Sequence, residues 1–179
     1  GHIERHNPVI KHAKNKLMKG EWGELIAISS KRLSSYPSRI KDVGVVFDLA
    51  VHDLDVMKYL AGSDFGSVSA SGSSFNNNNF IDHAGILVSF SNGVEAICEV
   101  SWLTPIKVRK IFLTTTSHYI ELDYMDQSIN LSKSHFINQE NNDMYSSSLE
   151  VESTNYSIPK EEPLTNELLD FLEAISTNS

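Results

Sequence analysis

The middle of this sequence is a series of short extended segments separated by turn residues, and this pattern constrains the fold more than any other feature. The segments are Val68–Ser74, His83–Phe90, Val94–Trp102, Val108–Thr116, Tyr119–Asp123 and Ser128–Leu131. Such runs are typical of antiparallel sheets, so we expect an open, mostly antiparallel sheet of about six strands. Ser91-Asn92-Gly93 predicts a tight hairpin turn, because Asn and Gly tolerate positive φ at its central positions.

Helices flank this strand-rich region. Asn7-Pro8 predicts a helix start, with Asn as the N-cap and Pro at the first helical position, and Gly20 ends that helix. A second helix precedes the strands, ends at Gly62, and carries an apolar face made of Ala50, Leu54, Met57 and Ala61. A third carries the apolar stripe Leu164, Leu168, Phe171, Leu172 and Ile175. Segregated helices and strands predict an α+β domain with the helices on one face of the sheet.

Three remaining segments complete the predicted organisation. Leu25–Lys31 predicts a strand, the polar segment Arg32–Asp42 predicts a loop, and Asn138–Tyr156 predicts a long loop with at most one strand. The 179 residues are enough for one domain with a proper core, so we expect residues 1–179 to form a single domain.

Charge and hydropathy exclude several classes of partner. The net charge of −8 argues against nucleic acid or an anionic membrane surface, since both need clustered Lys and Arg. No apolar run approaches the ~18–20 residues of a membrane span. The first residues do not have the pattern of a signal peptide, so we expect none. Cys98 is the only cysteine, so no internal disulfide is expected and we expect a cytoplasmic protein.

Asp48 and His52 are the first candidates for chemistry, because they lie four residues apart in the second predicted helix. Residues with this spacing share one helical face. A carboxylate beside an imidazole holds one tautomer, stabilises the imidazolium and supports acid–base chemistry near neutral pH. The residues alone leave two alternatives open. One is an exposed ion pair without function, and the other is the His-Asp dipeptide with which all-helical phosphohydrolases bind metal.

The order of motifs resembles the second domain of the glucose–fructose oxidoreductase and inositol dehydrogenase (Gfo/Idh/MocA) family. Gly1–Pro8 is similar to the start of that domain, and Asp42 to Asp55 to its Gly-rich segment followed by an Asp-x-x-x-His pair. Phe90 to Trp102 is similar to its strand–turn–strand, and Glu162 to Leu172 to its late helix. The segment Trp102 to Arg109 is most like the nucleotide-sugar 3-dehydrogenase branch.

This resemblance implies a dihydrodipicolinate-reductase-like C-terminal domain that oxidises a secondary alcohol of a sugar, cyclitol or nucleotide sugar. His52 is then the general base and Asp48 the group that orients it. The implied substrate contacts are Arg5, Asn7, Lys31, Arg32 and Asp55. NAD or NADP is implied for the full-length protein, held by an N-terminal Rossmann domain absent from this chain. We therefore expect the chain alone to bind no cofactor or metal and to be inactive.

The resemblance implies two kinds of partner. One is a sugar-type substrate, and the other is a second copy of the chain, bound through the open sheet face in a homo-oligomer. The competing hypothesis is a binding or oligomerisation module that retains the fold without the chemistry. The joint presence of Asp48, His52 and Asp55 favours the enzyme.

Overall fold

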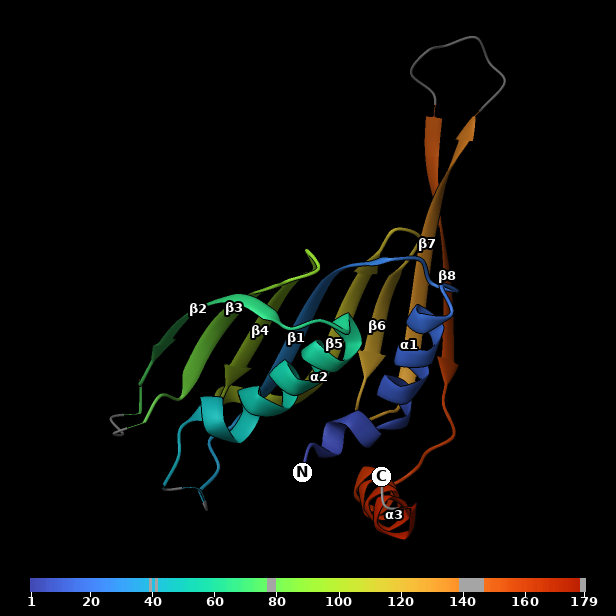
Figure 1. Ribbon diagram of the computed structural model, residues 1–179. Coiled ribbons are helices and arrows are strands. Elements are labelled where there is room, and N and C mark those ends of the chain that lie inside the picture. The colour runs from blue at the N-terminus through green and yellow to red at the C-terminus, as the bar shows by residue number, and fades with distance from the viewer. Residues whose placement is uncertain (39, 41, 77–79, 139–146, 178–179) are drawn as a thin grey trace.

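The structure is a computed structural model that describes residues 1–179 except 39, 41, 77–79, 139–146 and 178–179. Its centre is an eight-stranded sheet with the order β2-β3-β4-β1-β5-β6-β7-β8 (Figure 1). Central β1 runs parallel to β4 and antiparallel to β5, and the other neighbouring strands are antiparallel. The strands are β1 (Leu25–Ser35), β2 (Phe65–Ser73), β3 (His83–Phe90), β4 (Glu95–Ser101), β5 (Leu103–Thr115), β6 (Tyr119–Asp123), β7 (Ser128–Asn138) and β8 (Ser147–Ser157).

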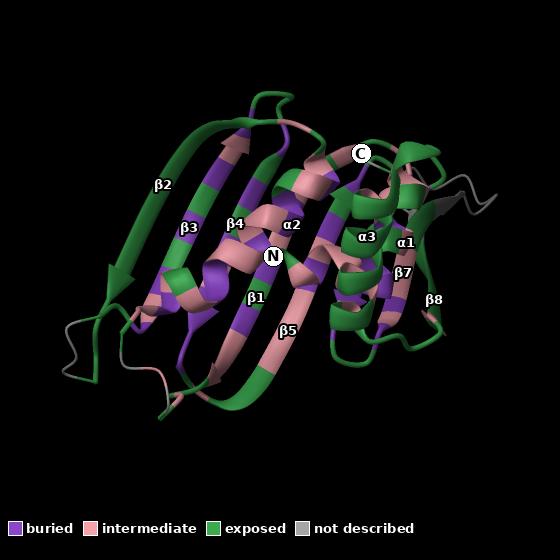
Figure 2. Cartoon of the chain, turned by 60° about the horizontal axis from the view of Figure 1, so that its bottom comes forward, coloured by how far each residue is buried: buried purple, intermediate pink, exposed green. Residues whose placement is uncertain are grey.

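In the described part of the chain, the helices pack against one face of this sheet (Figure 1). They are η1 (Ile3–His6), α1 (Pro8–Met18), η2 (Val46–Ala50) and α2 (Val51–Ala61), with α3 (Pro163–Thr177) packed against η1. The predicted α+β class with an open, mostly antiparallel sheet is confirmed. Figure 2 shows why this face forms the core: buried and exposed residues alternate along β3 and β4, as the period of a strand requires.

The predicted helix boundaries rest on capping interactions that the structure shows. The Asn7 side chain accepts a hydrogen bond from the Val9 N–H at 3.2 Å, and Pro8 is the first residue of α1. Gly20 follows that helix with a φ of +69°. Gly62 caps α2 with a φ of +63°, and its N–H donates to the Lys58 carbonyl.

The hairpin between β3 and β4 forms where it was predicted, with a different turn. The Phe90 N–H donates to the Val94 carbonyl, so the loop has three residues, Ser91-Asn92-Gly93. Of these, Gly93 alone has a positive φ, at +88°. Three-residue hairpins favour a glycine in the left-handed region at their last position, which explains why Asn92 does not need that conformation.

The sheet has more strands than the six or so expected, because two segments were predicted as a loop and as a long loop with at most one strand. β1 continues to Ser35, whereas Arg32–Asp42 was predicted to be a loop; residues 39 and 41 lie outside the described residues. β8 occupies much of Asn138–Tyr156, of which residues 139–146 lie outside the described residues. Its side chains from Glu150 to Asn155 are exposed at the sheet edge. Such a strand shows no apolar alternation and is held by backbone pairing with β7.

The second predicted helix begins only at Val46, and its first turn, η2, is a π-helix. Residues 42–44 precede it without forming a helix, and Val45 is its N-cap with helical φ and ψ. Its buried stripe also differs from the predicted one and consists of Asp53, Val56, Met57 and Leu60.

Among the described residues, no helix combines the length and the apolar content needed to cross a bilayer.

Candidate functional site

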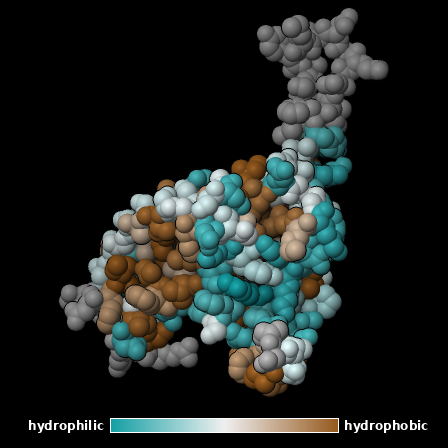
Figure 3. Space-filling view, in the orientation of Figure 1, coloured by the Kyte–Doolittle hydropathy of each residue, from teal (hydrophilic) through white to brown (hydrophobic). Residues whose placement is uncertain are grey.

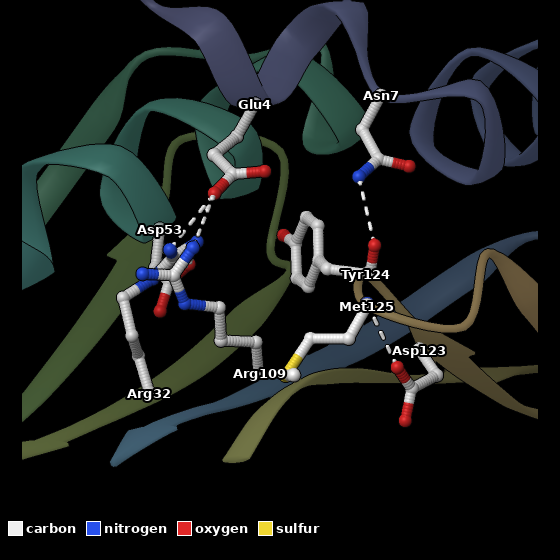
Figure 4. A network of polar contacts seen from close by, with 8 residues as sticks. All are labelled: Glu4, Asn7, Arg32, Asp53, Arg109, Asp123, Tyr124 and Met125. Carbon is white, nitrogen blue, oxygen red and sulfur yellow. Dashed lines mark hydrogen bonds and ion pairs between the residues drawn. The ribbon is translucent and has the colours of Figure 1, made fainter. Parts of the chain in front are cut away.

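A buried arginine lies at the centre of a charged cluster between β1, η1 and α2 (Figure 4). Arg32 follows Ile28 and Ser30 on the helix-facing side of β1 and is 3% exposed. Its Nε and Nη2 donate to Asp53 Oδ1 at 3.0 and 2.7 Å, and its Nη1 donates to Glu4 Oε1 at 2.8 Å. Although burial opposes its charge, Asp53 and Glu4 raise the pKa of Arg32 above its ordinary value. Arg32 therefore ties three elements together as a permanent cation.

Arg109 is the second arginine of this cluster. It lies directly opposite Arg32 in the β1–β5 register, and its Nη1 is 3.9 Å from the same Glu4 oxygen. Burial, followed by the charge of Arg32, lowers the pKa of Arg109. The Tyr124 ring packs against Arg32 with a centroid distance of 5.3 Å. Burial raises the pKa of the Tyr124 hydroxyl well above its usual value, so this group stays protonated.

His52 is half-buried on the first turn of α2, beside this cluster. Burial lowers its pKa, and the charge of Arg32 lowers it further, against weaker opposing effects of Glu4, Asp53 and Asp48. Its Nδ1 is buried and has no hydrogen-bond partner among the described residues. The imidazole is therefore neutral near pH 7 and able to accept a proton.

Asp48 lies in the π-helical turn η2, so its spacing of four residues from His52 does not run through a regular α-helix. A π-turn closes with i→i+5 hydrogen bonds, which changes the angular offset between residues four apart. Among the described contacts, no hydrogen bond joins Asp48 to His52, and Asp48 has the weakest of the effects that raise the His52 pKa. Its influence on the imidazole is a through-space charge effect. Turns of this kind occur frequently at functional sites.

Arg5 and Asp55 form a second ion pair, which joins η1 to α2. Arg5 Nε and Nη2 each donate to an Asp55 oxygen at 2.6 Å, and the Asp55 side chain is 9% exposed. The Arg5 guanidinium also lies over the Tyr59 ring at 5.5 Å. His2 Nδ1 is 3.4 Å from the same carboxylate. Both Arg5 and Asp55 thus have protein partners in the described structure.

Two other predicted contact residues have protein partners outside the Asp48/His52 turn. The Asn7 amide caps α1 and donates to the Tyr124 carbonyl at 3.2 Å, so this buried side chain holds the fold together. Lys31 follows the strand alternation onto the sheet face opposite Arg32, where its ammonium is 3.3 Å from Glu99. The structure brings Arg32 beside the Asp48/His52 turn and does not bring Lys31 there.

Sequence reasoning missed Glu4, Asp53, Arg109 and Tyr124 as members of the cluster. The neighbouring Lys107 and Lys110 make this part of β5 look like a solvated strand face in the sequence, but about two thirds of the Arg109 side chain is buried. Asp53 uses its carboxylate for Arg32, so the His52–Asp53 dipeptide belongs here to an ion-pair network.

One cavity among the described residues does not have His52 in its lining. It measures about 670 Å³ and lies where the C-terminal ends of α1 and α2 approach β1, with Lys14, Leu60 and Asn92 in its lining. The candidate site is characterised by its charged side chains.

This fold and these groups define a domain built around an open sheet and a half-buried histidine. Residues 10–121 match the family described as GFO/IDH/MocA C-terminal domain. The chain belongs to that family and is an oxidoreductase-type C-terminal domain.

Two curated proteins are similar to this chain at modest identity. UDP-N-acetylglucosamine 3-dehydrogenase of Acidithiobacillus ferrooxidans is 25% identical over 131 residues, which are 73% of this chain and 40% of the relative. The uncharacterized oxidoreductase YrbE of Bacillus subtilis (strain 168) is 32% identical over 112 residues, which are 56% of this chain and 32% of the relative.

Solved structures share the fold. UDP-N-acetylglucosamine 3-dehydrogenase GnnA from Acidithiobacillus ferrooxidans has a TM-score of 0.82 at 23% identity, over 100% of this chain and 54% of that one. Levoglucosan dehydrogenase in complex with NADH and levoglucosan has a TM-score of 0.75 at 17% identity, over 99% of this chain and 56% of that one. The chain thus spans about half the length of these solved relatives and less of the two similar sequences.

Proposed function

We propose that this chain is the substrate-binding and catalytic half of an NAD(P)-dependent oxidoreductase that acts on a secondary alcohol of a sugar, cyclitol or nucleotide sugar. The proposal rests mainly on the state of His52, whose imidazole is neutral and half-buried beside the charged cluster around Arg32. The names of the relatives support the reaction class, because one is a nucleotide-sugar dehydrogenase and another was solved with NADH and levoglucosan.

In this proposal, the chain's own part of the chemistry is proton transfer. Oxidation of a secondary alcohol removes a proton from oxygen and a hydride from carbon, and His52 takes the proton. Because Nδ1 is buried, Nε2 is the nitrogen that a substrate hydroxyl can reach. The negative charge of Asp48 favours the imidazolium that forms. In the reverse direction, the same imidazolium returns the proton to the carbonyl oxygen.

The described residues do not fit the diphosphate of a nicotinamide dinucleotide. Such a group binds a Gly-rich turn between a strand and the N-terminus of a helix. The glycine before η2, Gly44, has a different use: a Cβ there would lie 3.0 Å from the Ile81 carbonyl oxygen, so its absence permits close backbone packing. We therefore assign NAD or NADP to an N-terminal Rossmann domain outside these 179 residues.

The surface around the N-terminus suits such a neighbouring domain. Gly1 lies against Glu167 of α3, so a preceding segment would emerge beside this helix. The apolar residues of α3 are 48–62% exposed: Leu164, Leu168, Leu169, Phe171, Leu172 and Ile175. Figure 3 shows this apolar surface at the bottom of the molecule. Apolar patches of this kind on a monomer usually mark an interface.

The open sheet face is the proposed site of self-association. A hollow of about 330 Å³ on this face is lined by Leu87, Ile97, Phe112 and Tyr119, among others. Lys31 and Glu99 lie beside it as an exposed ion pair. An apolar centre with a polar rim is the usual anatomy of an interface. Light scattering at micromolar concentration is expected to give a dimer or tetramer, and a strict monomer would contradict this assignment.

Steady-state kinetics of the full-length protein, which includes the proposed N-terminal Rossmann domain, test the catalytic proposal. His52→Ala is expected to lower the rate of NADH formation by ~10²–10⁴. Asp48→Asn should lose less, since it removes only a charge effect, and Asp55→Ala the least. Near-wild-type turnover for His52→Ala would remove His52 from the mechanism and favour a non-catalytic module with this fold. Calorimetric titration of the 179-residue chain with NAD⁺ and NADP⁺ is expected to show no binding.

A further inference from the structure

Arg109 has donors that no described protein group uses. Arg32 directs its Nε, Nη1 and Nη2 to two carboxylates within hydrogen-bond distance. Arg109 has instead one ion pair of 3.9 Å, to the Glu4 oxygen that Arg32 already binds. This distance is too long for a hydrogen bond. Among the described contacts, the Arg109 guanidinium makes no hydrogen bond, although about two thirds of the side chain is buried.

This position is unfavourable for a guanidinium without a ligand. Like charges directly opposite each other on adjacent strands destabilise a sheet, and Arg109 stands opposite Arg32. A long side chain on a solvated strand could instead extend its charge into water, as the exposed Lys107 does on the same strand. Figure 4 shows the two guanidinium groups converging on Glu4. The cluster therefore holds an additional cation at its solvent-accessible side.

The free donors define the chemistry of the ligand. A guanidinium is a planar fork that matches phosphate and carboxylate oxygens bidentately. Asp53, which Arg32 binds, directly follows His52 in α2, so the cluster connects Arg109 to the candidate base. An anion at Arg109 would thus bind at the charged cluster that lies beside His52.

We propose that Arg109 binds an oxyanion carried by the substrate, either a phosphate or a carboxylate attached to the sugar. This inference rests on the proposed function and adds a specificity-determining residue to it. Glu4 holds Arg109 only at long range, so it aligns the guanidinium without occupying its donors. A neutral sugar would leave these donors to water, and an anionic sugar would use them.

Ligand titrations of the ¹⁵N-labelled chain, followed by NMR, test this directly. The probes are UDP-N-acetylglucosamine for a phosphate, glucuronate for a carboxylate and N-acetylglucosamine as the neutral sugar. Charge-assisted hydrogen bonds are worth enough for Arg109→Gln to weaken binding of the preferred anionic probe about tenfold or more. Lys107→Gln, which removes an exposed cation two residues away, should leave all three affinities unchanged. Arg109→Lys should recover part of the loss.

The outcomes separate this inference from the proposed function. If Arg109→Gln weakens the binding of neutral and anionic probes equally, Arg109 has a structural role and the inference is overturned. The absence of saturable chemical-shift changes at millimolar ligand would also overturn it. Saturable binding of N-acetylglucosamine around His52 without any gain from phosphate or carboxylate would also overturn it, while the proposed sugar oxidoreductase would stand. Which anionic probe responds identifies the source of the oxyanion.

Discussion

Replacing Arg32 by Met is expected to destabilise the fold by about 3–5 kcal/mol, because it leaves buried carboxylates without their cation. Asp53 is 1% exposed and receives two hydrogen bonds from Arg32, and Glu4 receives a third. Removing one partner of such a pair costs far more than the pair contributes relative to apolar residues. Since a whole domain is stable by about 5–15 kcal/mol, this loss takes a large part of the total.

Urea unfolding at pH 7 measures this effect through the transition midpoint. With an m-value of ~1–3 kcal/mol/M, the midpoint should fall by roughly 1 M or more. Arg5→Met is the matched control, because the Arg5–Asp55 pair has equally good geometry but an arginine side chain that is 40% exposed. It should cost about 1 kcal/mol or less.

A double-mutant cycle then separates the ion pair from its desolvation. Arg32→Met combined with Asp53→Leu removes both buried charges, so the double variant should be more stable than Arg32→Met alone. The reasoning is refuted if Arg32→Met costs no more than Arg5→Met, or if the second substitution adds its full cost to the first.

Three further predictions concern caps, turns and pH. Asn7→Ala should cost about 1–2 kcal/mol in thermal unfolding, since it removes the α1 cap and the bond to the β6–β7 turn, whereas the exposed Asn15→Ala should cost little. Gly93→Ala should destabilise by about 1 kcal/mol at a φ of +88°, while Gly85→Ala, with open space around it, should be neutral or slightly stabilising in the same assay. Because burial lowers the His52 pKa below 6.5, the unfolded state binds more protons at and below that pH. Stability should therefore fall as the pH drops from about 7 to 5, and His52→Gln should reduce this slope in urea unfolding at each pH.

The fold was largely accessible from the sequence because its signals are local. Asn7-Pro8 and Gly62 mark helix ends through backbone chemistry that acts within a few residues. The alternation of strands such as His83–Phe90 follows from burial on one face. β8 was predicted only as one strand allowed within a long loop, without bounds, because an exposed edge strand buries no side-chain pattern and its pairing with β7 is visible only in three dimensions.

The candidate site was less accessible, because its groups meet across the sheet. Lys31 and Arg32 were predicted as equal substrate contacts, yet consecutive residues of a strand point to opposite faces. The loop assigned from Arg32 onward hid this alternation. The turn at Asp48 is π-helical, and nothing in the local residue types distinguishes such a turn from an α-helical one.

One signal could nevertheless have found the buried pair. Extending the period of two from Ile28 places Arg32 on the core side of β1. In α2, the residues at spacings of three, four and seven from Asp53 are Val56, Met57 and Leu60, so this carboxylate lies within the buried stripe. A charge placed in a core requires an opposite charge, and each of these two residues supplies the partner that the other lacks. The two charged residues that interrupt the apolar patterns, Arg32 and Asp53, therefore form an ion pair with each other. This ion pair holds α2, with His52 on its first turn, against the centre of the sheet.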